Sequence, residues 1–477
     1  MWNRIVCRYR SLSKPVKASL WFVVSNVIVQ GVSFFTLPIF SRMLTTAEYG
    51  VVSTYQSWRS LVSIITTLTI WGGVFNIAMV KHTDSQATVI SSFQGLAVSN
   101  TLLFFLISIV LLEPLSKLIN LSESLICCIY IDILVGIPFA LWSSQQRFIY
   151  EYKKLIIISL GMAIANPLLG IIAVTYSPHK AEAKIISQVI AYSVLGVIFF
   201  AINQKNGKTF FHRHYWKYAY QFNVALIPHY LSMQILNQSD RIMINTMCGS
   251  SDAGIYGVAY NFGMLLQLLT GAVESSLTPY ILNGLKRNSN DTKKHINQIV
   301  CILALVTMMV ICVIPEIFRW LLPQDYYSSM WAIPPITAGM FFCFIYPMFG
   351  IVELYYEKKT YMVYASIIAA IVNVLTNYIF IGCYGYIAAA YTTLGCYILL
   401  CLCHYLFMKK IMKTHGEKNK IFDIKTMVII SLSVIVFSLI MVLLYEKFVL
   451  RWGIVLLIIF GFLCNINRFK AILKSKV

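Results

Sequence analysis

Stretches of about 20 apolar residues recur along almost the whole chain, and only short polar loops separate them. A helix of about 20 residues is long enough to cross the hydrocarbon core of a bilayer. With 58% hydrophobic and 12% charged residues among its 477, the chain has too little polar surface for a water-soluble globule. We predict an all-α polytopic membrane protein with about 14 transmembrane helices, at 18–40, 51–80, 88–112, 124–146, 155–176, 184–202, 218–246, 253–282, 298–319, 329–352, 361–381, 384–407, 426–445 and 451–467.

The net charge of +20 would suggest nucleic acid binding in a soluble protein, but here it follows the rule that cytoplasmic loops are rich in Lys and Arg. With a cytoplasmic N-terminus, few basic residues lie outside, chiefly Lys117, Lys180, Lys184 and Lys447. The inside segments hold many more: Arg4, Arg8, Arg10, Lys14, Lys17, Lys153, Lys154, Arg213, Lys217, Lys286, Arg287, Lys358, Lys359, Lys409 to Lys425 and Lys470 to Lys476. This predicts an even number of spans, both termini cytoplasmic, and no nucleic acid partner.

Neither a metal site nor a catalytic site is evident in the sequence. The 12 cysteines are scattered, and the only close pairs are Cys127 with Cys128 and Cys401 with Cys403. A metal site would need His or carboxylate ligands at suitable spacing, so we interpret these cysteines as small packing residues. The longest polar loops, near 203–217, 283–297 and 408–425, are too short for a soluble catalytic domain. We therefore expect no cofactor and no enzyme activity, and we expect the first apolar stretch to be a retained span.

A weak internal repeat divides the chain. Glu48-Tyr49-Gly50-Val51 matches Ile255-Tyr256-Gly257-Val258 with tyrosines 207 positions apart, and Ala191 to Gly196 matches Ala390 to Gly395 at a separation of 199. Six spans per repeat bring both halves in from the cytoplasm, so the repeat is parallel and a substrate pathway is expected between the lobes. We predict an N-terminal lobe at 1–203, a C-terminal lobe at 204–410 and a helix pair at 411–477.

Ionisable residues inside predicted spans are costly and therefore mark candidate functional sites. Arg59 lies near the middle of the second span, where two interpretations are compatible. Its guanidinium group is suited to attract a phosphate or other anion in a water-filled lumen, or it forms a structural ion pair with an acid such as Asp132 in the fourth span.

The other candidates also leave alternatives open. Asp240 and Arg241 lie toward the outer end of the seventh span, where they either serve a substrate or fix the helix end. Asp132 and Glu274 are candidates for binding a coupling proton or cation, or else are counterions or polar packing residues. His229 follows a proline near the middle of the seventh span and is either a satisfied polar residue at a kink or a proton relay.

Two turns resemble those of a known family. The stretch Asp240 to Ile244, followed by Ser251 to Tyr260, is similar to the seventh-to-eighth helix region of bacterial polysaccharide-unit flippases, and Leu37 to Thr45 followed by Glu48 to Gly50 is similar to the matching first turn. These are the Wzx-type O-antigen and capsule flippases of the MATE-like multidrug/oligosaccharidyl-lipid/polysaccharide superfamily. At the level of motifs the resemblance is confined to these two turns, whereas topology and length match over most of the chain.

The resemblance implies two six-helix lobes that alternate between inward-open and outward-open states. The implied substrate is an undecaprenyl-diphosphate-linked oligosaccharide, an O-antigen or capsule repeat unit, moved from the cytoplasmic to the outer leaflet of a bacterial inner membrane. Arg59 and Arg241 would hold the diphosphate, with Asp132, Asp240, Glu274 and His229 as coupling groups or counterions for a proton or sodium ion. Membrane lipids and the polysaccharide polymerase and chain-length machinery are the implied partners.

Two other functions compete with this one. A MATE-like cation-coupled exporter would use a lumen dominated by buried carboxylates, whereas arginine is at least as prominent here. A membrane-embedded O-antigen polymerase would carry a large extracytoplasmic loop, and the outer loops of this chain are short.

Overall fold

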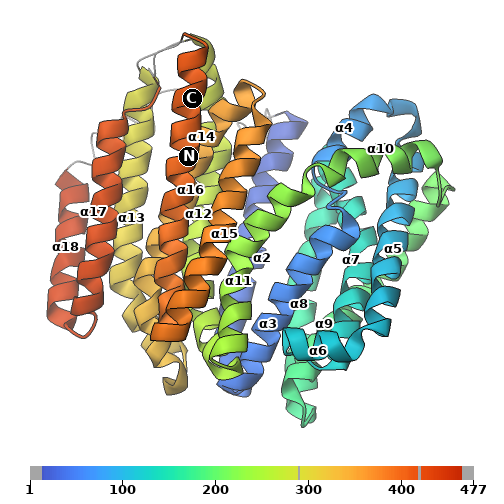
Figure 1. Ribbon diagram of the computed structural model, residues 1–477, viewed down its shortest axis with the longest axis horizontal. Helices are drawn as coiled ribbons and strands as arrows, with labels where there is room; N and C mark the ends of the chain where they lie inside the picture. The colour runs from blue at the N-terminus through green and yellow to red at the C-terminus, as the bar shows by residue number, and fades with distance from the viewer. Residues whose placement is uncertain (1–12, 288–290, 417–420, 465–477) are drawn as a thin grey trace, which may run out of the picture. The chain divides into compact units, whose positions relative to one another are not determined.

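The computed structural model describes residues 13–287, 291–416 and 421–464, and all regular structure in these ranges is helical (Figure 1). The predicted all-α polytopic fold is confirmed. Ten of the described helices or helix pairs are long and apolar enough to cross a membrane. The total of 14 spans, and the lobes 1–203, 204–410 and 411–477, stay predictions. The basic residues within 4–10, 417–420 and 465–477, which were used to predict the cytoplasmic segments, lie outside the described residues.

The chain forms two compact units, Met1–Gln234 and Ile235–Val477, and the boundary between them falls within one helix, α11. The first unit contains α2 (Lys14–Met43), α3 (Thr46–Thr67), α4 (Gly73–Lys81), η1 (Thr83–Ser85), α5 (Gln86–Val110), α6 (Leu112–Ile119), α7 (Glu123–Phe148), α8 (Tyr152–Tyr176), α9 (Lys180–Gly207) and α10 (Arg213–Val224).

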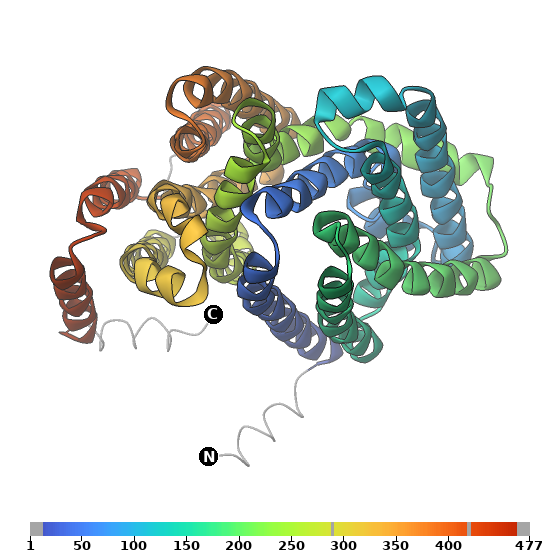
Figure 2. The ribbon, with the colours of Figure 1, turned by 90° about the horizontal axis from the view of Figure 1, so that it is seen from below.

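The second unit is built around α14, whose residues are mostly buried. Helices α17 and α18 lie at the edge of this unit beside α13 (Figure 2). The bounds are α11 (Ile227–Met247), α12 (Ser250–Arg287), α13 (Asp291–Leu321), η2 (Gln324–Ala332), α14 (Ile333–Tyr355), α15 (Lys359–Tyr384), α16 (Ile387–Thr414), α17 (Ile424–Leu444) and α18 (Phe448–Cys464).

The parallel repeat is visible in the helix bounds. Helices α8 and α15 begin 207 positions apart, as do α9 and α16, and α9 packs against α7 and α8 as α16 packs against α14 and α15. Tyr49 and Tyr256 both lie near the start of a helix, in α3 and α12. The second sequence match is not structurally equivalent, because Tyr192 is the thirteenth residue of α9 and Tyr391 the fifth of α16.

The second predicted span, 51–80, consists of two helices, which corrects the prediction of one. Helix α3 begins earlier, at a capping box in which Glu48 N–H donates to Thr45 Oγ1 and Thr45 N–H donates to Glu48 Oε2. It ends at Thr67, and the capping residue that follows, Leu68, is left-handed at φ 54°. Asn100 of α5 donates to the carbonyls of residues 65 and 66 over 3.2 and 2.7 Å, so a side chain from another helix satisfies the end of α3.

The seventh predicted span, 218–246, is likewise divided into α10 and α11. Pro228 is the second residue of α11, where a missing N–H is tolerated because first-turn donors have no partner within the helix. The prediction that His229 lies near the middle of a helix is therefore wrong, since it is the third residue of α11. In Figure 1, α4 and α10 lie side by side at one end of the first unit.

Helices α7 and α9 pack closely together in the first unit. A Cβ atom at Gly196 of α9 would lie 2.5 Å from the carbonyl oxygen of Val135, so glycine permits α9 to approach α7. Tyr55 of α3 and Ile133 of α7 are buried in the same apolar core.

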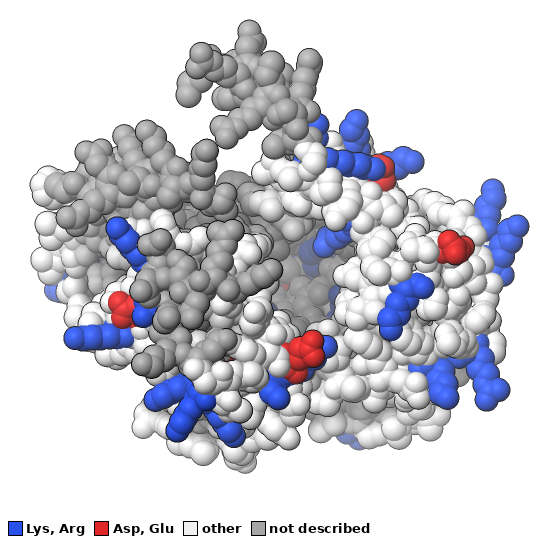
Figure 3. All heavy atoms as spheres, turned by 90° about the horizontal axis from the view of Figure 1, so that it is seen from above, with Lys and Arg blue, Asp and Glu red and all other residues white. Residues whose placement is uncertain are grey.

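Lysine and arginine predominate over acidic side chains on the face drawn in Figure 3.

Candidate anion and coupling sites

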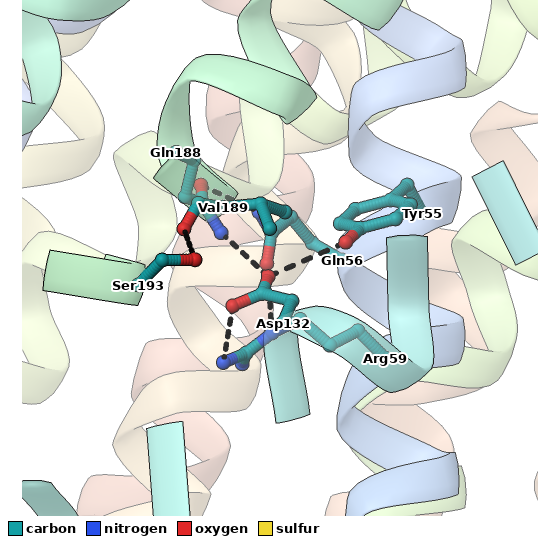
Figure 4. A network of polar contacts seen from close by, with 7 residues as sticks. All are labelled: Tyr55, Gln56, Arg59, Asp132, Gln188, Val189 and Ser193. Carbon is teal, nitrogen blue, oxygen red and sulfur yellow. Dashed lines mark hydrogen bonds and ion pairs between the residues drawn. The ribbon is translucent and has the colours of Figure 1, made fainter. Parts of the chain in front are cut away.

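A buried carboxylate, Asp132 of α7, joins three helices of the first unit (Figure 4). Arg59 Nε lies 2.6 Å from Oδ2, and Arg59 Nη2 donates to Oδ1 over 3.1 Å. Tyr55 OH and Gln188 Nε2 donate to Oδ2 over 3.3 and 3.0 Å. A buried carboxylate needs an ionic partner and hydrogen-bond donors, and this set supplies both to Asp132 inside the helix bundle.

Arg59 is the accessible member of the pair. Its side chain is 29% exposed whereas Asp132 is fully buried, and it is the fourteenth of the 22 residues of α3. Its contacts with Asp132 use Nε and Nη2, and none of the described residues accepts a hydrogen bond from Nη1. The structure thus shows the ion pair that the sequence suggested, and the outer edge of the guanidinium group stays available to an anion.

Sequence reasoning missed the neutral residues of this site. Gln56 Nε2 donates to Gln188 Oε1 over 3.0 Å, which fixes the amide that serves Asp132. Tyr55, Gln56 and Arg59 lie within about one turn of α3, and Gln188 comes from α9. Glutamines inside apolar spans were the signal that could have found this network.

Asp240 of α11 lies in a second, neutral network within the second unit. The carboxylate is fully buried and accepts hydrogen bonds of 2.7 Å each from Tyr256 of α12, Asn377 of α15 and Thr393 of α16. Asn373 Nδ2 donates to Thr393 Oγ1 over 3.2 Å and forms an outer layer. Asp240 has no ion-pair partner among the residues that the structure describes.

Arg241 points away from this network although it is adjacent in sequence. Its guanidinium carbon lies 4.3 Å from the centre of the Tyr260 ring, and Nη2 donates to the backbone oxygen of Asn237 over 2.8 Å. Tyr397 OH donates to Asn237 Oδ1 over 2.6 Å. Only 9% of Arg241 is exposed, so it is less accessible than Arg59.

Of the two remaining predicted residues, His229 contacts its neighbour Tyr230, and Glu274 joins neither network through a described contact. The ring of His229 lies 5.7 Å from that of Tyr230. Glu274 is half-buried in α12 and forms no ion pair with a described residue.

Two further pairs of ionisable residues, largely buried between helices, were missed by sequence reasoning. Glu353 Oε1 and His404 Nδ1 are 2.9 Å apart between α14 and α16, with side chains 0% and 3% exposed. Arg451 of α18 donates in a bidentate manner to Glu316 of α13, with distances of 2.8 and 2.5 Å. Both pairs lie near the predicted span ends, where ionisable residues are easily read as solvated. Within the described ranges there is no group of three His, Cys, Asp or Glu that could hold a metal ion.

Comparison with known proteins assigns the chain to a family. Residues 16–285, more than half of the chain, match the family model described as polysaccharide biosynthesis protein. The chain belongs to this family. The Lsg locus putative protein 1 of Haemophilus influenzae is 23% identical over 351 residues, which cover 70% of this chain and 80% of that protein.

Two solved structures share the fold. The lipid II flippase MurJ in an inward closed conformation has a TM-score of 0.70 at 15% identity, covering 94% of this chain and all of that one. A multidrug resistance MATE family transporter of the MOP superfamily, in an inward-facing conformation, has a TM-score of 0.61 at 10% identity, covering 82% and 98%. The resemblance to MATE-like polysaccharide flippases is thereby confirmed at the level of family and fold. This chain is a multi-pass membrane protein, and these two structural neighbours are a flippase and a transporter.

Proposed function

We propose that this protein is a flippase that moves an undecaprenyl-diphosphate-linked oligosaccharide from the cytoplasmic to the outer leaflet of a bacterial inner membrane by alternating access. In this proposal both termini are cytoplasmic, and the polysaccharide polymerase and chain-length machinery receive the product. The observation that carries the proposal is the partly exposed Arg59 beside the buried Asp132, in a chain of the polysaccharide biosynthesis family.

The Arg59 site is suited to reversible binding of a diphosphate. A guanidinium group presents donors in a plane that matches two phosphate oxygens. Asp132 partly neutralises this charge, and Tyr55 and Gln188 stabilise the carboxylate when Arg59 turns to an anion. The substrate is therefore attracted without being held too tightly for release. Arg241 is a second candidate, with Tyr260 beneath its guanidinium group.

Asp240 is the strongest candidate for a coupling site. A carboxylate with only neutral donors around it keeps an uncompensated negative charge away from water, which is costly. A proton or a monovalent cation would remove this cost, and the oxygens of Tyr256, Asn377 and Thr393 are already gathered around it. Glu274 stays a lesser candidate because it joins this network through no described contact, and His229 stays a candidate at the start of α11.

The polyprenyl chain of the substrate needs an apolar path. A groove in the second unit is lined by α14, α16 and α17, including Phe342, Phe349, Leu402, Val428 and Leu432. Its lining is almost entirely apolar, which fits an isoprenoid chain rather than a headgroup.

The test is the sidedness of lipid-linked oligosaccharide in cells that lack this protein. Wild type should restore display of the units on the outer face. Arg59→Gln should reduce translocation about 10–100-fold, which corresponds to the free energy of one hydrogen bond to a charged group. Arg59→Lys should retain part of the activity because it keeps the charge. Arg319→Gln, which removes an exposed arginine at the end of α13, is the matched control.

Three outcomes would contradict the proposal. Units that reach the outer face but stay unpolymerised without this protein would indicate a polymerase. Normal glycan together with sensitivity to cationic dyes would indicate a drug exporter. If wild type and Arg59→Gln restore translocation equally, the Arg59–Asp132 pair is structural and the proposed role of Arg59 in binding the diphosphate is wrong.

A further inference from the structure

Helix α9 presents a row of polar residues on one face, at intervals of four positions. Lys180, Lys184 and Gln188 are the first, fifth and ninth residues of α9, and residues four apart lie above one another on a helix. Gln188 donates to Asp132, so the row leads from the Arg59 site to the end of the first unit that holds the turn between α2 and α3. Each step is about 6 Å along the helix axis.

Lys180 has an ordinary structural role. Its Nζ donates to the backbone oxygen of Met43 over 3.0 Å, and Met43 is the last residue of α2. A lysine that satisfies a helix C-terminus at a span end needs no further explanation.

Lys184 is different because its charge has no acidic partner. No carboxylate among the described residues lies within ion-pair distance of its ammonium group. Its Nζ lies 4.3 Å from the centre of the Phe40 ring of α2, and the side chain is half-buried. Cation–π contact compensates only part of the loss of water around an ammonium group.

The neighbouring helix is shaped around this side chain. A Cβ atom at Gly170 of α8 would lie 2.9 Å from Lys184 Nζ and 3.0 Å from Phe40 Cζ. Gly170 is six residues before the end of α8, so the ammonium group lies about 9 Å inside that helix end rather than extending past it. Extension toward water at the membrane surface therefore does not explain Lys184.

We propose that the Lys184 ammonium group is a second phosphate-binding position, which receives the diphosphate of the substrate from Arg59 on its way to the outer end of the first unit. This rests on the proposed function, and it adds an exit position to it. One helical turn separates Lys184 from Gln188, and the absence of a described acidic partner leaves its charge to a phosphate. The phosphate source is the lipid-linked diphosphate, and a phospholipid headgroup is the alternative source of the same chemistry.

The experiment uses the full-length protein in phosphatidylcholine nanodiscs, with undecaprenyl diphosphate and inorganic pyrophosphate as probes. Lys184→Met should weaken binding of undecaprenyl diphosphate about tenfold, the loss of one charge-assisted hydrogen bond, and Lys184→Arg should bind within about threefold of wild type. Gly170→Ala should also weaken binding, because the added methyl group displaces the ammonium group without removing charge. Lys117→Met is the matched control, since Lys117 is exposed and paired with Glu113 at 2.7 Å.

A second measurement separates binding from folding. Modification of Lys184 by an amine-directed reagent should slow when either probe is present and should not slow in Arg59→Gln, where delivery is lost. Normal binding by Lys184→Met while Arg59→Gln loses it would overturn the exit position and leave the flippase intact. Protection by phosphatidylglycerol that undecaprenyl diphosphate cannot displace would assign the site to a membrane lipid and also overturn it. Failure of wild type to bind undecaprenyl diphosphate at all would count against the proposed function itself.

Discussion

Buried ionisable residues in both units are held by partners on other helices. Glu353 and His404 illustrate the cost of such a pair, since Glu353 Oε1 contacts His404 while Glu353 Oε2 has no hydrogen-bond partner among the described residues. The ring of Tyr346 stacks on His404 at 5.3 Å. The pair takes the place of apolar packing between α14 and α16. Its contribution to the free energy of unfolding therefore depends on both members being present.

We predict strong non-additivity for this pair. His404→Leu alone leaves a buried carboxylate uncompensated and should destabilise the protein by about 3–5 kcal/mol, whereas Glu353→Leu with His404→Leu should recover most of that loss. The measurement is a double-mutant cycle of thermal unfolding in detergent. Ser438→Ala, a buried serine of α17, controls for a general loss of packing. If the effects of the two single variants simply add, the residues do not act as a pair.

Individual helices were predictable where hydropathy alone decides their extent. The boundaries of α5, α7 and α9 follow apolar stretches, and the depth of Arg59 and Asp132 pointed to their pairing. The end of α3 was not predictable, because its left-handed turn is satisfied by Asn100 of another helix. The network at Asp240 brings α11 and α12 together with α15 and α16, and Asn377 lies 137 positions from Asp240 in the sequence.

Part of that network was nevertheless readable. Asn373 and Asn377 are four residues apart in an otherwise apolar span, which places two amides on one face of α15. Such a pair inside a membrane helix indicates a polar partner from a neighbour. Asn377 donates to Asp240, and this partner could be identified only once α11 and α15 were brought together.

At the starts of α2 and α8, a surface ion pair gives a pH-dependent contact. Lys14 Nζ lies 2.6 Å from Glu151 Oε1, and the hydrogen bond and charge of Lys14 lower the pKa of Glu151 below its ordinary value. Because the pKa is lower in the folded state, the stabilisation is present above the unfolded pKa of about 4.3 and is lost as pH falls through the folded pKa.

We therefore predict that Lys14→Ala lowers the melting temperature slightly and equally at about pH 6 and pH 8, with the difference from wild type disappearing as pH falls through the lowered folded pKa of Glu151. The pair is exposed, so the effect is small and should shrink in high salt. Thermal unfolding across this range is the measurement, with Lys117→Ala as a second exposed pair for comparison. A difference that grows toward acidic pH would show that Lys14 acts through another group.

For the whole molecule, the proposed function raises the question of which gradient drives translocation. The two units contain chemically different carboxylate sites: Asp132 is neutralised by an arginine, whereas Asp240 has only neutral donors. Because only the second carboxylate lacks a cationic partner among the described residues, we assign energy coupling to the second unit and substrate charge to the first. Asp240→Asn removes the charge while keeping an acceptor for Tyr256 and Thr393, so the fold should persist.

In proteoliposomes, Asp240→Asn should abolish the dependence of translocation on an imposed gradient while retaining slow, gradient-independent exchange of lipid-linked oligosaccharide. Imposing a pH gradient without sodium, and a sodium gradient at equal pH, identifies the ion in the wild type. Asp132→Asn should behave in the opposite way, with coupling retained and affinity for the diphosphate increased because Arg59 is released from its partner. Loss of gradient dependence in Asp132→Asn but not in Asp240→Asn would reverse the assignment. A structural defect is distinguished from both results, because it would slow translocation under every gradient.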